Sequence, residues 1–115
     1  MKVRTKVQSP LNPGAAELIS RRFRALSDPT RLRILDYLRT NEEASVGELA
    51  EALGTSQQNL SKHLAALLAE AFVARRKQGT SSLYRIADQG VHELCDGVCA
   101  GIQAQLAELE AVLGG

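Results

Sequence analysis

The sequence predicts a mostly helical domain that carries one β-hairpin. Apolar residues recur at helical spacing in five segments of the 115-residue chain. Only 3% of the residues are aromatic, so the core must be built from Leu, Ile, Val and Ala, a composition that favours helices. Residues 72–86 differ, because two short apolar stretches flank a Gly-containing turn there, which is the pattern of a hairpin.

The length of the chain fits a single domain. We expect residues 1–12, which lack an apolar period, to form a flexible arm, and residues 13–115 to form the folded domain. No apolar run approaches the roughly 18 residues of a membrane span, and the N-terminus has no apolar segment typical of a secretory signal. We therefore expect a cytoplasmic protein without a membrane partner, in which the two cysteines are free thiols.

The first two helices are predicted over residues 14–26 and from Pro29 onward. Ser27 or Asp28 can cap the second helix, and proline suits its first turn. The polar residues 39–44, RTNEEA, then predict a loop. The apolar positions of these two helices are Leu18, Ile19, Phe23, Leu26, Leu32, Ile34, Leu35 and Leu38.

Residues 45–69 predict two helices joined by a tight turn. Gly54 suits the turn, and Thr55 or Ser56 can cap the helix that follows. This order is that of a helix-turn-helix motif, whose second helix reads DNA bases with amide, hydroxyl and basic side chains. The candidates are Ser56, Gln57, Gln58, Asn59, Ser61, Lys62 and His63. A solvated helix surface is the alternative for each of them, and His63 fits the edge of the core equally well.

The hairpin that follows the helix-turn-helix is expected to form a wing. Arg75, Arg76 and Lys77 on its first strand can reach DNA phosphates, but at most two can face DNA together because side chains alternate along a strand. Charge is uneven in the rest of the chain, since residues 1–40 hold nine basic and three acidic side chains while residues 87–115 hold five acidic and no basic ones. A basic face toward a polyanion is one interpretation, and an ordinary solvated surface is the other.

The last helix is predicted over residues 88–113 and has a long apolar stripe. We expect it to lack a partner within so small a fold, and therefore to pair with a second copy of the chain. A dimer through the first and last helices would bury Leu18, Val91, Leu94, Val98, Ile102, Leu106 and Leu109.

Taken together, these blocks resemble the arsenic-repressor (ArsR/SmtB) family of bacterial regulators. The resemblance covers residues 17–113 and rests on LSDPTRLRILDYL, SVGELAEALGTSQQNLSKHLAALLAEAFV and ARRKQGTSSLYRI, in that order. It implies a winged helix-turn-helix fold with the hairpin between the fourth and fifth helices. It also implies a dimer that binds a palindromic operator in double-stranded DNA and is released when an effector binds.

Two effector sites of that family are incomplete in this sequence. The cysteine-rich motif at the start of the third helix is absent, because Ser45, Val46 and Gly47 stand there. A zinc site on the last helix would use Asp88, but Gly90 stands where the family has histidine. The later positions that would complete this site are Gly101 and Ala104.

Cys95 and Cys99 are the remaining candidates for an effector site. They lie one helical turn apart, so their thiolates can converge on one soft ion such as arsenite or another thiophilic metal. One helix can supply little more than these two thiolates, so a third ligand would come from the paired helix of a dimer, and His92 is one candidate. Redox or sulfur-species sensing and a purely structural role as small buried residues are the alternatives.

The sequence therefore predicts a sequence-specific DNA-binding repressor that needs no cofactor to bind DNA. No Ser-His-Asp set, phosphate-binding loop or dinucleotide-binding glycine pattern is present, so an enzyme is not expected. An adaptor that uses the same fold without binding DNA is the remaining alternative.

Overall fold

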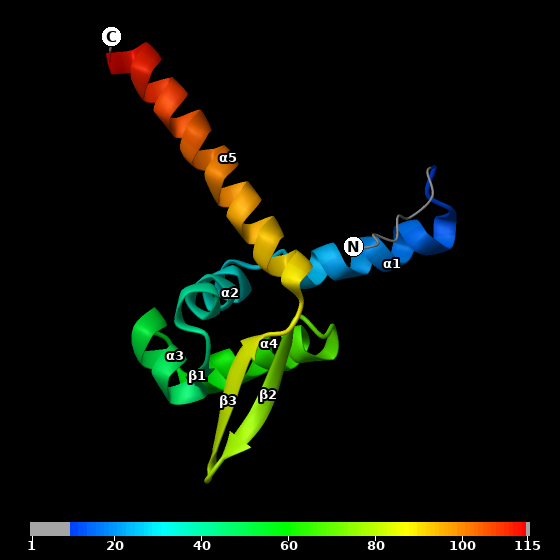
Figure 1. Ribbon diagram of the computed structural model, residues 1–115, viewed down its shortest axis with the longest axis vertical. Coiled ribbons are helices and arrows are strands. Elements are labelled where there is room, and N and C mark those ends of the chain that lie inside the picture. Colours follow the sequence, from blue (N-terminus) through cyan, green and yellow to red (C-terminus); the bar gives the residue numbers. More distant parts are fainter. Residues whose placement is uncertain (1–9, 115) are drawn as a thin grey trace, which may run out of the picture.

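The computed structural model describes residues 10–114, which form five helices and three short strands (Figure 1). Residues 1–9 of the expected N-terminal arm lie outside this part. The elements are α1 (Pro13–Leu26), α2 (Pro29–Asn41), β1 (Ala44–Ser45), α3 (Val46–Leu53), α4 (Gln57–Ala69), β2 (Val73–Gln78), β3 (Ser81–Ile86) and α5 (Gln89–Gly114). In the described residues, no helix combines the length and apolar character needed to cross a bilayer.

Local sequence sets where the helices of the helix-turn-helix begin and end. The Ser45 hydroxyl accepts a hydrogen bond from the Glu48 backbone N–H, and the Glu48 carboxylate accepts one from the Ser45 N–H. This reciprocal capping box satisfies two N–H groups at the start of α3. Gly54 ends α3 with a φ of 66°, a left-handed conformation that glycine adopts readily. Ser56 then caps α4 by accepting from the Asn59 N–H.

The three strands form one antiparallel sheet in the order β1-β3-β2. The β2–β3 hairpin runs in register from Val73–Ile86 to Gln78–Ser81 and is the predicted wing. The short strand β1 is not predicted by the sequence, because residues 39–44 look like a polar loop. Instead α2 continues to Asn41, and Ala44 is fully buried where it pairs with Tyr84 of β3. This pairing joins residues 40 positions apart, which no local pattern reveals.

The hydrophobic core lies where α2, α3 and α4 meet the base of the sheet. Its fully buried large side chains are Ile34, Leu35, Leu49, Leu60, Leu64 and Leu67. The outer helices α1 and α5 contribute little to this core. Within their described residues, α1 buries only Leu26 and α5 buries only Val91. The core therefore fixes α4 firmly and leaves most of α1 and α5 at its margin.

Helix α5 leaves the body of the molecule after its first turns (Figure 1). Those turns contact α2 and β3, so the expectation that this helix has no partner inside the fold is wrong for its beginning. Val91 is also corrected: it is 4% exposed within one chain, and the chain's own core already covers it. The other expected interface residues remain exposed by 38–54%: Leu18, Leu94, Val98, Ile102, Leu106 and Leu109.

Candidate nucleic-acid interface and cysteine groove

The first turns of α4 carry a row of exposed polar side chains. Ser56, Gln57, Gln58, Ser61 and Lys62 are exposed, and Asn59 is half-buried. The Asn59 amide donates to the Thr55 hydroxyl at 3.1 Å, so part of its hydrogen-bonding capacity already holds the turn. The opposite side of the helix is anchored in the core by Leu60 and Leu64. This surface offers hydroxyl, amide and ammonium groups on a rigid support.

His63 does not belong to this exposed row. It is 7% exposed, and its Nδ1 atom accepts a hydrogen bond from Arg31 Nε of α2 at 3.2 Å. Arg31 Nη1 in turn donates to the Ala25 carbonyl at 3.1 Å. Position 63 lies one turn from both Leu60 and Leu67 on the buried side of α4. His63 is therefore removed from the predicted DNA-contacting set, because its side chain joins α4 to α2.

The three basic residues of β2 are divided between the two faces of the wing. Arg75 shares a hollow with Ser61 and Ala65 of α4, so it lies beside the exposed polar row. Lys77 follows two residues later and points to the same face by strand alternation. Arg76 lies on the other face and forms a two-pronged ion pair with Glu43, with Nε–Oε2 at 2.7 Å and Nη2–Oε1 at 2.8 Å.

The contact with Arg76 changes the acidity of the Glu43 carboxyl group. Its pKa lies below the usual value, first because of the hydrogen bond from Arg76. A carboxylate that stays ionised keeps Arg76 neutralised at physiological pH. Of the three basic residues of β2, Arg75 and Lys77 therefore share the face beside α4, whereas Arg76 is paired with Glu43 on the other face.

Cys95 and Cys99 line one apolar groove beside α1 and α2. The groove has a volume of about 540 Å³. Cys95 is half-buried and Cys99 is exposed, and both are free thiols. Its lining is Phe23, Leu26 and Ser27 near the end of α1, Leu32, Arg33 and Asp36 from α2, and Leu94, Cys95, Val98, Cys99 and Ile102 from α5. The contributions of α1 and α2 are not predictable from the sequence, since no local pattern places these helices opposite the cysteines.

The pKa of the Cys95 thiol is raised, first by burial and then by the nearby Cys99. Arg39 opposes this shift weakly. Cys95 is therefore held in its protonated form more strongly than a free cysteine. A ligand that bonds to its sulfur must displace that proton.

His92 is engaged away from the two cysteines. Its Nδ1 atom lies 3.3 Å from the Asp96 carboxylate, one turn later on α5. Asp96 also pairs with Arg39 of α2, which holds Asp36 at 2.5 Å. Within residues 10–114, no group of three or more His, Cys, Asp or Glu side chains could hold a metal ion. One chain thus brings together the two thiols, while its own His92 is engaged with Asp96.

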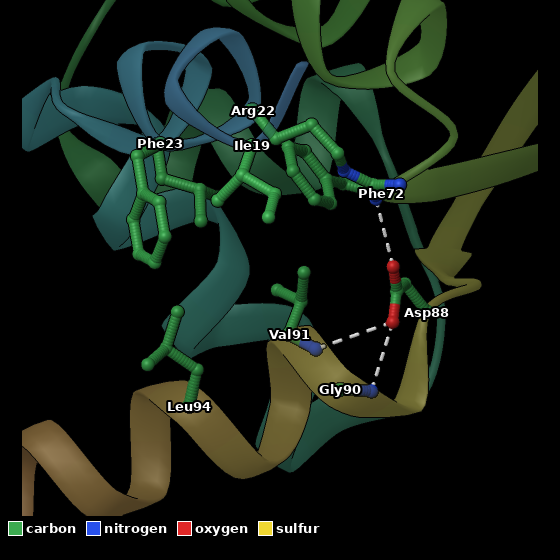
Figure 2. Close-up of a pocket in the computed structure, with 9 residues that line it drawn as sticks. Ile19, Arg22, Phe23, Phe72, Asp88, Gly90, Val91 and Leu94 are labelled. Atoms are coloured by element: carbon green, nitrogen blue, oxygen red, sulfur yellow. Dashed lines mark hydrogen bonds and ion pairs between the residues drawn. The ribbon is translucent and has the colours of Figure 1, made fainter. Parts of the chain in front are cut away.

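Asp88 joins the start of α5 to α1, as Figure 2 shows. One of its oxygens accepts from the backbone N–H of Gly90 at 2.8 Å, and the other lies 2.8 Å from Arg22 Nη2. The Arg22 guanidinium also stacks over the Phe72 ring, 4.5 Å from its centroid. Asp88 therefore holds the start of α5 against α1. The histidine that would complete the zinc motif is absent, because Gly90 stands in its place.

The comparisons with known proteins agree with this architecture. Residues 26–76 match a family model described as a helix-turn-helix domain. The chain is 38% identical over 85 residues to the HTH-type transcriptional regulator KmtR of Mycobacterium tuberculosis, covering 74% of this chain and 65% of KmtR. It is 39% identical over 75 residues to the "Probable mercury resistance operon repressor" of Streptomyces lividans, covering 65% of this chain and 59% of that protein. The matched region thus spans less than two thirds of the length of these two relatives.

Two solved structures are similar over most of the chain. One is the homodimeric winged helix-turn-helix DNA-binding domain of Mb0332 from Mycobacterium bovis, a possible ArsR-family transcriptional regulator. It matches with a TM-score of 0.74 and 31% identity, covering 88% of this chain and 95% of that one. The other is the antimony-specific transcriptional repressor AntR, with a TM-score of 0.75, 26% identity and coverage of 88% and 92%.

Proposed function

Because the chain belongs to the ArsR/SmtB family of winged helix-turn-helix transcriptional regulators, we propose that it is a homodimeric repressor of a palindromic operator, released by an effector. The family consists of DNA-binding regulators and not of enzymes. A regulator of this kind works in the cytoplasm, where it meets its operator. No cofactor is needed for the DNA contact, because the side chains of α4 supply the hydrogen-bonding groups.

The observation that carries the proposal is the shared surface of α4 and the wing. Gln57 and Gln58 stand exposed at the N-terminal turns of α4, where a recognition helix meets base edges in the major groove. Arg75 lies beside Ser61, within reach of the same duplex. Side chains suited to base edges and to phosphates thus lie on one face of the molecule, which supports the proposal.

A dimer follows from the exposed apolar side of α5. Ile102, Leu106 and Leu109 repeat at helical spacing and are each more than half exposed in one chain. Contiguous apolar surface of this kind marks an interaction site in a protein that must stay dissolved. A two-fold dimer would place two copies of α4 in successive major grooves, roughly 34 Å apart. The homodimeric Mb0332 domain provides a precedent for this arrangement.

Binding to the promoter region of the protein's own gene tests the proposal. Fluorescence anisotropy would compare that duplex with a scrambled one of equal length and composition. The wild-type protein should prefer the promoter, and Gln57→Ala should reduce the preference by roughly 1–3 kcal/mol, the discrimination of one good base contact. Gln103→Ala on α5 is the matched control and should change nothing. Equal binding of both duplexes by the wild-type protein would contradict the proposal.

The proposed effector is a thiophilic metal or metalloid bound by Cys95 and Cys99. Two thiols that line one groove support this choice, as do the mercury and antimony named for the relative and for the solved structure. The expected coupling is about 1–3 kcal/mol between effector and operator, and it is reciprocal. Operator release by arsenite, cadmium or lead should occur in the wild type and disappear in the double variant Cys95→Ser/Cys99→Ser.

Redox or sulfur-species sensing is the competing role for the same cysteines. An intrahelical disulfide between residues four apart fits disulfide geometry poorly, so oxidation would require distortion of the helix or a bond between subunits. Release by an oxidant alone, with a cross-linked dimer on a non-reducing gel, would favour this alternative. Equal release from the wild type and the serine variant would leave the cysteines without a sensing role.

A further inference from the structure

The hollow between α4 and the wing combines hydrogen-bond donors with an apolar wall. Its volume is about 550 Å³. The polar lining residues are Ser61 of α4, Arg75 of β2 and Tyr84 of β3, and the apolar ones are Ala65, Leu68 and Ala69 of α4. No acidic side chain is among these lining residues. Within residues 10–114, the three polar side chains have neither a hydrogen-bond partner nor an ion-pair partner.

Tyr84 differs from the other two polar residues because its side chain is almost fully buried. It is 7% exposed and belongs to the core, and its strand lies between β1 and β2 in the sheet. A sealed hydroxyl without a partner would be costly. The Tyr84 hydroxyl is unpaired but not sealed, so it reaches the surface that this residue contributes to the hollow. The core thus holds one hydrogen-bonding group at a fixed place in the wall.

The register of the wing places Arg75 directly beside this hydroxyl-bearing side chain. Arg75 and Tyr84 are partners in the pairing of β2 with β3, so their side chains lie on the same face of the hairpin. Ser61 lines the same hollow from α4. A guanidinium, a phenol and an alcohol therefore gather where no carboxylate competes for them. This donor set suits an anion with several oxygen atoms, as phosphate is.

The position of the hollow along α4 indicates which phosphate this is. Ser61 follows Gln57 by one helical turn, so both lie on the same side of the helix, about 6 Å apart along its axis. The major groove is about 12 Å wide and its walls are the phosphate backbones. When Gln57 meets base edges, Ser61 and the hollow therefore lie toward one wall of the groove. The apolar side chain of Ala65 is suited to contact the adjoining sugar.

We infer that one phosphodiester of the operator backbone occupies this hollow and accepts hydrogen bonds from Ser61, Arg75 and the Tyr84 hydroxyl. The inference deepens the proposed function and rests on it. Arg75 supplies the charge, whereas Tyr84 supplies a neutral donor. An exposed arginine must be ordered on binding, while the Tyr84 ring is already ordered by the core. Tyr84 thereby fixes the wing at one phosphate and sets the register of α4 in the groove.

Removal of a single oxygen tests the role of Tyr84. Tyr84→Phe should weaken binding to the promoter duplex about five- to tenfold, as expected for one lost hydrogen bond to a charged group. The slope of log affinity against log salt should stay unchanged, because a neutral donor releases no counterion. Fluorescence anisotropy at several salt concentrations measures both quantities, and urea melts check that the variant is as stable as the wild type.

The second tyrosine of the chain provides the matched control. Tyr37 lies on α2 and does not line the hollow, so Tyr37→Phe removes the same oxygen at a distance from the proposed contact. It should leave both the affinity and the slope unchanged. Equal affinities of Tyr84→Phe and Tyr37→Phe would overturn the inference, as would a Tyr84→Phe effect that appears only with the promoter and not with a scrambled duplex.

Neutral phosphates locate the contact on the DNA. Each phosphate of the promoter duplex is replaced in turn by a methylphosphonate, and the wild type, Tyr84→Phe and Arg75→Ala are titrated against every duplex. At one position in each half-site, the penalties of both variants should shrink, because the contact is already weakened on the DNA side. Elsewhere both penalties should persist. Penalties that shrink at two different positions, or at none, would show that the two residues do not share a phosphate.

Failure of the inference can be told apart from failure of the proposed repressor. If the wild type prefers its promoter but Tyr84→Phe binds equally well, the inference is overturned and the repressor stands. If the wild type binds the promoter and the scrambled duplex alike, the repressor proposal fails, and the comparison of the two tyrosine variants still decides the phosphate contact. Release of DNA by inorganic phosphate at constant ionic strength would overturn the inference by identifying free phosphate as the ligand.

Discussion

Arg75 and Arg76 are neighbours in the sequence but serve different surfaces of the wing. Arg75 lies beside Ser61 on the face that α4 presents, while Arg76 is neutralised by Glu43 on the other face. The difference arises from strand alternation, which separates adjacent side chains whatever their chemistry. The local sequence does not reveal which arginine is free to contact DNA, because the partner of Arg76 lies 33 residues earlier in the chain.

The two arginines should therefore differ in their effect on DNA binding. Arg75→Ala should weaken binding to all sequences and reduce the slope of log affinity against log salt by about one, as expected for one lost phosphate contact. Arg76→Ala should leave the slope nearly unchanged. Anisotropy titrations across a series of salt concentrations measure both slopes. A smaller slope for Arg76→Ala than for Arg75→Ala would show that the two faces are assigned wrongly.

Asp28 links the stability of α2 to pH. Its side chain caps the helix by accepting hydrogen bonds from the backbone N–H groups of Thr30 and Arg31 at 2.8 and 3.1 Å. Its pKa is lowered, first by the bond from Arg31. A lowered folded-state pKa means that the stabilisation is complete above the ordinary carboxyl value of about 3.9 and is lost as the pH falls through the folded-state value.

Urea unfolding between pH 5 and 2.5 should reveal this contribution. The wild-type free energy of unfolding should fall more steeply below pH 4 than that of Asp28→Asn, because asparagine keeps a capping oxygen but has no proton to gain. Parallel profiles down to pH 2.5 would mean that Asp28 titrates alike in the folded and unfolded chains.

Among the elements, the turn between α3 and α4 depends on one backbone conformation. Gly54 has a φ of 66° and no atom within 4 Å of where a Cβ would stand, so strain and not crowding opposes a side chain there. Gly47 is the second residue of α3, and a Cβ there would make an ordinary contact of 3.6 Å with the Gln57 side chain. The same substitution should therefore have opposite effects at these two positions.

Gly54→Ala should lower the free energy of unfolding by about 1–2 kcal/mol, the cost of a left-handed residue with a Cβ. Gly47→Ala should raise it by about 0.5–1 kcal/mol, because alanine is the better helix former. Denaturant melts of both variants provide the measurement. A destabilising effect of similar size at both sites would show that the turn has no special requirement.

Helix boundaries were predictable where capping residues mark them. Asp28 with Pro29, the Ser45–Glu48 capping box, Gly54 and Ser56 all act within a few positions in the chain. The structure differs from the sequence-based predictions where contacts between distant parts of the chain determine the position of a residue. Ala44 joins the sheet through β3, and Val91 is covered by the chain's own core. His63 lies between these cases, because its spacing from Leu60 and Leu67 indicated the buried side, although its Arg31 partner did not follow from any pattern.

In the whole molecule, a chain of contacts runs from the cysteines to the recognition helix. Asp96 lies next to Cys95 on α5 and pairs with Arg39 of α2. Helix α2 also carries Arg31, which donates to His63 inside α4. A shift of α5 on ligand binding can therefore act on α2, and α2 is tied to α4. The separation of two such recognition helices in a dimer is the quantity that operator DNA would sense.

That separation exists only if two chains pair, so the α5 interface should control operator binding. The double variant Ile102→Asp/Leu109→Asp places charges on the exposed apolar side of α5, where burial without a partner is costly. It should sediment as a monomer and lose most of its operator affinity, because one chain contacts only one half-site. The core of each chain does not include these positions, so circular dichroism should show little change.

The double variant Ala104→Asp/Ala111→Asp is the matched control, since it adds the same charge to the opposite side of the helix. At 100° per residue, positions 104 and 111 lie about 180–200° away from position 102. This protein should remain a dimer and keep its operator affinity. An intact dimer in the Ile102→Asp/Leu109→Asp variant would place the interface elsewhere. A stable monomer that still binds the full operator tightly would show instead that pairing is not needed for recognition.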